Sequence, residues 1–129
     1  MLIEVLISVL IFSVGVVALV ALQAAMTRAQ TEAKARTEAS YLATELVGLM
    51  WADVNNLSSY TTASCASNTQ CNMWLAKVQQ TLPTNDVAPE VTVDTAAGSP
   101  TLGDVYIKIT WRPPNGDARQ YEMSTSIKS

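Results

Sequence analysis

One carboxylate stands out among the residues of this sequence that could do chemistry. Glu4 is the only charged side chain in the first 27 residues, because residues 5–27 carry no formal charge. An acid within an apolar helix costs on the order of a few kcal/mol at the centre of a membrane. We therefore expect Glu4 either to be an early helix acid favoured by the helix dipole, which contributes about 0.3–1 kcal/mol, or to have a specific function.

The rest of the sequence offers no catalytic constellation. Histidine is absent, which removes the commonest general base and the commonest metal ligand. A serine nucleophile would need a lysine or another base held beside it, and no spacing in the sequence suggests such a pair. We expect no enzymatic activity, no metal site and no cofactor.

The two cysteines, Cys65 and Cys71, have five residues between them. This spacing fits neither a CxxC redox motif nor half of a zinc site, and no second pair completes a metal cage. In a reducing cytosol they would remain thiols, whereas on the far side of a membrane a small disulfide loop is favoured.

The charge of the chain gives no indication of nucleic-acid binding. The net charge is −3, and the eight lysines and arginines are spread from Arg28 to Lys128 without a cluster. A basic footprint for a phosphate backbone is therefore missing.

The first 27 residues are long and apolar enough to cross a bilayer, for which about 20 apolar residues suffice. A cleaved secretory signal fits this stretch poorly, since the apolar run is too long and an acid occupies the place of a basic n-region. We therefore divide the chain into a membrane-spanning helix half, residues 1–27, and a polar head, residues 28–129, which includes an amphipathic helix half.

A single long helix is expected from the start of the chain to about residue 54. No proline occurs before Pro83, and no glycine occurs between Gly15 and Gly48. Beyond Arg28 the apolar residues recur at spacings of three and four, which predicts one buried helix face. These residues are Ala35, Ala39, Leu42, Leu46, and Leu49 or Met50.

The head is expected to contain a short helix and a small antiparallel sheet. Asn72 is expected to cap a helix over residues 73–82, and residues 90–95 alternate as a strand does. The clearest strand covers residues 104–112, and a return strand covers residues 119–127 with Tyr121, Met123 and Ile127 on its buried face. The fold class is therefore α+β: a long N-terminal helix with an antiparallel sheet of three to four strands packed on its C-terminal half.

The beginning of the chain resembles a known family. The residues Met-Leu-Ile-Glu-Val-Leu-Ile at positions 1–7 are similar to the start of mature type IV pilins and of type II secretion pseudopilins. In that family a buried glutamate neutralises the N-terminal amine of the neighbouring subunit, and the resemblance gives this role to Glu4. One residue fewer precedes Glu4 than precedes the family's glutamate. Methylation of the first residue is a family property as well.

Gly15 resembles a family glycine near which pilin helices can loosen in the filament. The alternative is that Gly15 is a small residue that lets helices pack closely in the membrane. Both readings remain open at the level of sequence.

The head resembles PilV-type minor pilins in Trp74, in Leu82-Pro83 and in Ile109-Thr110-Trp111. The resemblance implies a ladle-shaped minor pilin that primes or caps a type IV pilus, with adhesion, twitching motility or DNA uptake as possible roles of the filament. It implies an inner-membrane location with a periplasmic head, followed by an extracellular one in the pilus. The implied partners are other pilin subunits, prepilin peptidase and the pilus assembly machinery.

Two other functions fit the same residues. A type II secretion pseudopilin or a major pilin would share the chemistry of the anchor. A membrane-anchored periplasmic binding module that never polymerises is the more distant alternative.

Overall fold

The computed structural model describes residues 1–84, 87–100 and 102–128. The chain divides into two compact units, Met1–Lys34 and Ala35–Ser129. One helix, α1 (Leu2–Ala52), supplies the whole of the first unit and the beginning of the second. The long predicted helix is thereby confirmed.

The first unit consists of the N-terminal part of α1, and every side chain in it is exposed. Its hydroxyl groups bond within the helix: Ser8, Ser13 and Thr27 each donate to the carbonyl oxygen four residues earlier, over 2.7–3.0 Å. These polar side chains therefore do not prevent the helix from lying in an apolar medium. By length and composition, α1 is the one helix in the described residues that could cross a membrane.

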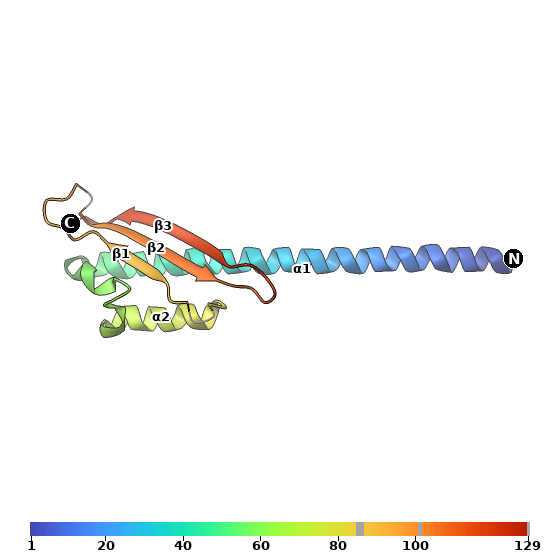
Figure 1. Ribbon diagram of the computed structural model, residues 1–129, viewed down its shortest axis with the longest axis horizontal. Coiled ribbons are helices and arrows are strands. Elements are labelled where there is room, and N and C mark those ends of the chain that lie inside the picture. The colour runs from blue at the N-terminus through green and yellow to red at the C-terminus, as the bar shows by residue number, and fades with distance from the viewer. Residues whose placement is uncertain (85–86, 101, 129) are drawn as a thin grey trace. The chain divides into compact units, whose positions relative to one another are not determined.

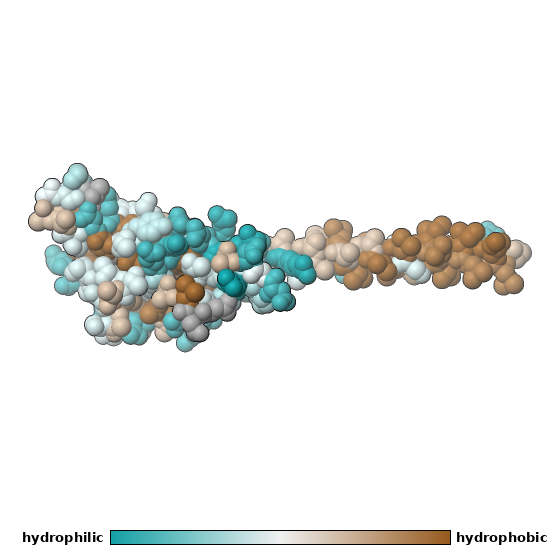
Figure 2. Space-filling model, in the orientation of Figure 1, coloured by the Kyte–Doolittle hydropathy of each residue, from teal (hydrophilic) through white to brown (hydrophobic). Residues whose placement is uncertain are grey.

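Apolar residues cover the surface of this first unit as far as about residue 27, whereas its last residues and the surface of the second unit are mostly polar (Figure 2). Such a surface on an isolated helix is unfavourable in water, because each square ångström of apolar area left in water costs about 25 cal/mol. The first unit therefore needs lipid or other apolar helices around it.

The second unit is built on the remainder of α1 and has its own hydrophobic core. The predicted buried stripe is confirmed at Ala39, Leu42, Leu46 and Met50, while Ala35 is half-buried. Figure 1 shows the sheet across this part of α1 and a second helix, α2 (Thr69–Thr81), beside it. The amphipathic face of α1 is thus covered by both elements.

The sheet contains β1 (Glu90–Val93), β2 (Asp104–Trp111) and β3 (Arg119–Ser126), in the order β1-β2-β3. Both pairs are antiparallel, as predicted, with Val91 opposite Ile107 and Ile107 opposite Met123. Central strand β2 alternates without interruption, and its buried residues are Val105, Ile107, Ile109 and Trp111. Within the described residues the sheet has three strands rather than four.

The buried face predicted for β3 is only partly buried. Tyr121 and Met123 are half-exposed, and Ile127, just beyond the strand, is buried. The difference follows from the position of β3 at the edge of the sheet, where a strand has a neighbour on one side only.

The segment that follows α1 is more ordered than the expected loop. It forms two 3₁₀ helices, η1 (Val54–Tyr60) and η2 (Cys65–Ser67). The expected cap at Asn72 is wrong, since α2 begins earlier and Asn68 caps it: the Asn68 Oδ1 accepts from the backbone N–H groups of Gln70 and Cys71 at 2.9 and 3.2 Å. Asn72 lies inside the helix and donates to the carbonyl of Ala66.

Gly48 provides a test of how α1 is stabilised in the second unit. This glycine is exposed, and a Cβ added to it would meet no atom within 4 Å. Because glycine costs about 0.8–1.0 kcal/mol relative to alanine inside a helix, Gly48→Ala is expected to raise the free energy of unfolding by about that amount. Urea denaturation of the full chain in detergent, followed by circular dichroism, measures the change.

Gly103 is the matched control for that experiment. Its φ is +81°, and an added Cβ would collide with the carbonyl oxygen of Ile127. Gly103→Ala is therefore expected to destabilise the head, since the backbone must leave the left-handed region or displace Ile127. Equal effects of the two substitutions would contradict this description of the two sites.

Candidate functional site

Glu4 lies in the first turns of α1 with its side chain exposed. Its backbone carbonyl accepts a hydrogen bond from the Ser8 hydroxyl at 2.8 Å. The described residues include the ion pairs of Lys77 with Glu45, Lys108 with Glu90 and Lys128 with Asp104, and Glu4 has no ion-pair partner in the part of the chain that the structure describes. A cation for this carboxylate must therefore come from outside the described chain.

Glu4 shares one face of α1 with small residues. The positions that follow it at alternating spacings of four and three are Ser8, Ile11, Gly15 and Ala18, and residues at such spacings lie above one another on a helix. Further along the same line lie Leu22, Ala25 and Ala29. Apart from Glu4, Ile11 and Leu22, the residues of this line are small, and we call the line, from Glu4 to Ala29, the small-residue face.

The opposite side of the helix carries the larger side chains of Leu6, Val17 and Val20, interrupted by Ser13 and Ala24. Small residues let the backbones of two apolar helices approach closely, which strengthens van der Waals packing where no water drives association. A second helix lying on the small-residue face would therefore also lie close to Glu4.

Gly15 is the smallest member of the small-residue face. A Cβ added to it would meet nothing within 4 Å, and the helix continues through it without interruption. The fold of the single chain therefore does not require glycine here, although glycine costs about 1 kcal/mol against alanine in a helix. This observation favours a contact with another helix as the reason for its presence.

Cys65 and Cys71 form a disulfide, so the expected disulfide loop is confirmed. Both residues are buried, and the bond joins η2 to the first turn of α2. A second constraint lies alongside it, because the Asn68 amide that caps α2 also donates to the Ser59 hydroxyl at 2.6 Å. The start of α2 is thus fixed by a covalent link and by a cap.

Removal of the disulfide is expected to destabilise the head moderately. The closed loop spans a sequence separation of six residues, and loop-closure entropy for so short a loop corresponds to about 2 kcal/mol. Cys65→Ser combined with Cys71→Ser is expected to lower the free energy of unfolding by that amount, as measured by urea denaturation. Reduction of the wild-type chain with dithiothreitol is the control and should produce a loss of similar size; an unchanged midpoint in both would contradict the assignment.

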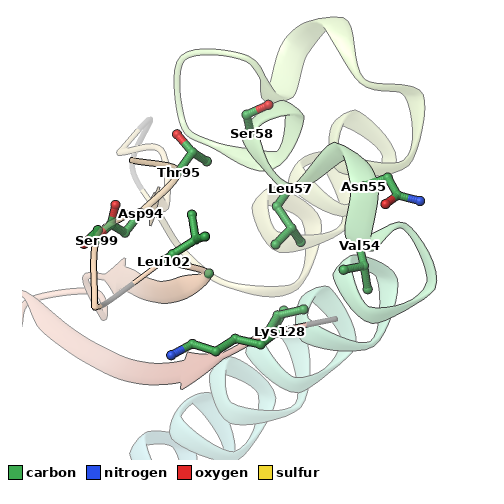
Figure 3. Close-up of a pocket in the computed structure, with 11 residues that line it drawn as sticks. Val54, Asn55, Leu57, Ser58, Asp94, Thr95, Ser99, Leu102 and Lys128 are labelled. Atoms are coloured by element: carbon green, nitrogen blue, oxygen red, sulfur yellow. The ribbon is translucent and has the colours of Figure 1, made fainter. Parts of the chain in front are cut away.

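The head contains a pocket of about 610 Å³ at the end of the second unit (Figure 3). Apolar side chains from Val54, Leu57 and Leu102 line it, and the hydroxyl groups of Ser58 and Thr95 lie at its rim. These groups can contact an apolar moiety and exchange hydrogen bonds with a polar one.

Asp94 is the acidic residue of the pocket, and its carboxylate bonds within its own loop. Its Oδ1 accepts from the backbone N–H of Ala96 at 3.0 Å, and its Oδ2 accepts from the hydroxyl of Ser99 at 2.8 Å. Figure 3 shows Asp94 and Ser99 together on the loop. This carboxylate shapes the wall of the pocket.

An ion pair that the sequence did not reveal joins α1 to α2. Lys77 Nζ lies 2.7 Å from Glu45 Oε2 and 5.3 Å from the centre of the Tyr41 ring. The hydrogen bond to Glu45 is the main cause that raises the pKa of Lys77. Since 32 positions separate the partners, only a knowledge of how the two helices pack could have predicted the pair.

A second polar contact lies just beyond the end of α1, between Tyr60 and Asp53. Tyr60 is buried and donates to Asp53 Oδ2 at 3.4 Å. Desolvation is the main cause that raises the pKa of Tyr60, so its hydroxyl remains a hydrogen-bond donor at neutral pH.

Comparison with known proteins adds no family to these observations: no family model, no curated protein and no solved structure matches the chain. A functional assignment therefore rests on the residues and their geometry.

Proposed function

We propose that this chain is a structural subunit of a type IV pilus, and specifically a minor pilin that primes or caps filament assembly. The observation that carries the proposal is Glu4, an acid without an ion-pair partner among the described residues, on the small-residue face of an exposed apolar helix. The resemblance of residues 1–7 to the start of mature pilins supports the same assignment.

The apolar first unit would serve in two environments. Before assembly, residues 1–27 cross the inner membrane once, and the head lies in the periplasm. After extraction by the assembly machinery, the helices of neighbouring subunits replace the lipid. The Cys65–Cys71 disulfide supports a head outside the cytosol, since disulfides persist mainly in oxidising compartments.

Glu4 would determine how neighbouring helices meet. A carboxylate buried among apolar helices is tolerated when a cation meets it, and the N-terminal amine of an adjacent subunit supplies that cation without a further charged side chain. Because Glu4 lies at one end of the small-residue face, close packing along this face and the ion pair at its end require the same arrangement of two helices. A shift between the helices would lose both.

A major pilin or a type II secretion pseudopilin would use the same anchor. Abundance separates the first from a minor pilin, because a major pilin forms most of the filament. Dependence on a secretion system rather than on pilus genes separates the second.

A membrane-anchored binding module that does not polymerise is the second candidate, and the head pocket favours it. The pocket is lined by both apolar and hydroxyl-bearing side chains, which suits the recognition of a small ligand. Such a module would give no reason for an unpaired Glu4 on a face of small residues.

Shearing of filaments from cells that produce the full chain tests the proposal. A minor pilin is expected in the sheared filaments at a small fraction of the amount of the main subunit, and only when the assembly ATPase is present. Its confinement to the membrane fraction of cells with abundant filaments would exclude the proposal and favour the binding module.

A further inference from the structure

The two edges of the sheet differ in the state of their backbone groups. The outer edge of β1 is covered at Val91, which Thr62 bonds three times. Thr62 N–H and Thr62 Oγ1 donate to the Val91 carbonyl at 3.0 and 3.2 Å, and Val91 N–H donates to Thr62 Oγ1 at 2.8 Å. The outer edge of β3 has no such cover in the part of the chain that the structure describes.

The bonds at the end of the sheet show which groups of β3 face outward. Opposite residues in an antiparallel pair alternate between those that exchange backbone bonds and those whose backbone groups point away from each other. Asp94 N–H donates to the Asp104 carbonyl, so the backbone groups of Asp104 point toward β1 and away from β3. Ile127 N–H donates to the Gly103 carbonyl, so the backbone groups of Gly103 and Ile127, the next pair along the two strands, point toward each other.

Because the pairs alternate along the register of β2 and β3, the direction of the backbone groups of every other residue of β3 follows. The residues that turn both N–H and C=O toward the open edge are Gln120, Glu122, Ser124 and Ser126. All four are exposed, and no described residue bonds their backbone groups. Four donors and four acceptors in a row form a template for a further strand.

β3 lacks most of the features with which proteins usually block an edge, although it carries the charged residues Arg119 and Glu122. It contains no proline and no lysine, it is eight residues long, and its register with β2 is unbroken, so no bulge turns it away. The edge is therefore open in geometry as well as in hydrogen bonding.

The surroundings of the edge indicate the side chains that an added strand would carry. Toward α1, the Ser40 hydroxyl donates to the Tyr121 hydroxyl at 3.3 Å, which places β3 beside this face of the helix. Thr44, Val47 and Trp51 follow Ser40 at helical spacings of four, three and four, and Trp51 is 50% exposed. Apolar side chains on the inner face of an added strand would pack on them.

On the opposite side of the sheet, Glu122 is the one charged residue among the four that face outward. Its carboxylate accepts a hydrogen bond from the Gln120 amide. Lys108 is the residue opposite Glu122 on β2, and its Nζ forms an ion pair with Glu90 Oε2 on β1, at 3.9 Å. A basic residue directly opposite Glu122 would complement its charge.

Pairing of β3 with the β3 of a second copy is disfavoured by the same charge. The two antiparallel registers that use the most of β3 place Glu122 either directly opposite the second Glu122 or diagonal to it, and like charges so close oppose pairing. The β1 edge of a second copy is only four residues long and is covered at Val91 by Thr62. The occupant is therefore a different protein.

We propose that the open edge of β3 receives an extended segment of another protein as a fourth strand, with apolar side chains toward α1 and a lysine or arginine opposite Glu122. Main-chain bonds supply affinity in this mode of recognition, and the alternate side chains supply specificity. Binding of a strand at β3 does not require filament assembly, so a failure of this proposal would leave the proposed function unaffected.

The test uses the full chain in detergent and a fluorescent nine-residue peptide, Thr-Val-Thr-Val-Lys-Val-Thr-Val-Thr, whose sequence reads the same in both directions. Binding is measured by fluorescence anisotropy. We expect saturable binding, a loss of roughly ten-fold or more when the backbone nitrogens of alternate residues are methylated, and a weaker interaction when glutamate replaces the central lysine. The Glu122→Lys chain should reverse the preference between the two peptides.

Ser124→Pro tests the edge from the side of the protein. It removes an outward N–H without removing a bond to β2, so the sheet should persist by circular dichroism while peptide binding falls roughly ten-fold or more. Ser124→Ala is the control and should bind like the wild type. Absence of peptide binding, equal binding of the methylated peptide, or a wild-type dimer that Ser124→Pro dissolves would each overturn the proposal.

Discussion

Replacement of Trp74 by alanine is expected to lower the free energy of unfolding of the head by about 3–5 kcal/mol. Trp74 is 3% exposed, and it packs in the core between α2 and α1. Its indole Nε1 donates to the carbonyl of Leu42 in α1 at 2.8 Å. The substitution therefore leaves a large cavity and also removes a buried hydrogen bond between the two helices.

Two other tryptophan substitutions separate these contributions. Trp74→Phe retains most of the ring but loses the bond, and it is expected to cost about 1–3 kcal/mol. Trp51→Ala removes a half-exposed side chain and is expected to cost less than about 1 kcal/mol. Urea denaturation of the full chain measures all three, and similar losses for Trp74→Ala and Trp51→Ala would contradict the assigned core.

Gly15→Leu is expected to reduce the amount of the chain in sheared filaments by about ten-fold or more. Insertion of a large side chain into a close helix contact typically costs 1–3 kcal/mol, and 1.4 kcal/mol corresponds to a factor of ten. Within the single chain the substitution should not destabilise the helix, because no atom lies within 4 Å of the position that the Cβ would take and leucine favours a helix more than glycine does. The loss would therefore report on a contact between chains.

Val17→Leu is the matched control, since Val17 lies on the opposite side of the helix and already carries a branched side chain. Immunoblots of the membrane fraction should show equal amounts of both variants, so that a loss from filaments is not a loss of protein. Normal incorporation of Gly15→Leu, or equal impairment of the two variants, would show that the small-residue face is not the contact.

Much of the fold followed from residue patterns because those patterns have a direct physical cause. In β2, Val105, Ile107 and Ile109 alternate with polar residues, and only a strand places all three on one side. The stripe from Ala39 to Met50 in α1 recurs with helical period and faces the core. Both elements bury one face, which fixes their conformation.

The segment between α1 and α2 could not be predicted in this way. Its 3₁₀ helices are stabilised by local side-chain bonds such as that from Asn56 to Asp53, at 2.6 Å. The apolar residues Val54, Leu57 and Tyr60 of η1 recur every three positions, but three residues are too few to establish a period from sequence. Asn68 and Asn72 are equally suitable helix caps by residue type. The bond from Asn68 to Ser59 and the disulfide at Cys71 fix the chain around Asn68, so the helix begins there. Those constraints become visible only in three dimensions.

Of the candidate sites, only Glu4 could be predicted from the sequence. Glu4 is conspicuous in the sequence because no other charge is near it. The ion pair of Lys77 with Glu45, the head pocket and the open edge of β3 each join segments that are far apart in the chain. They depend on how the elements pack, which local patterns do not encode.

The Glu4→Gln variant tests the central claim most directly, through its fraction in sheared filaments relative to the wild-type chain. If Glu4 meets the amine of a neighbouring subunit, loss of its charge leaves a buried cation unpaired, which costs about 3–5 kcal/mol, and the filament fraction should fall by more than about ten-fold. Asp117→Asn removes an equal charge from the exposed turn between β2 and β3 and should assemble normally. Incorporation of Glu4→Gln at the wild-type level would contradict the role assigned to Glu4.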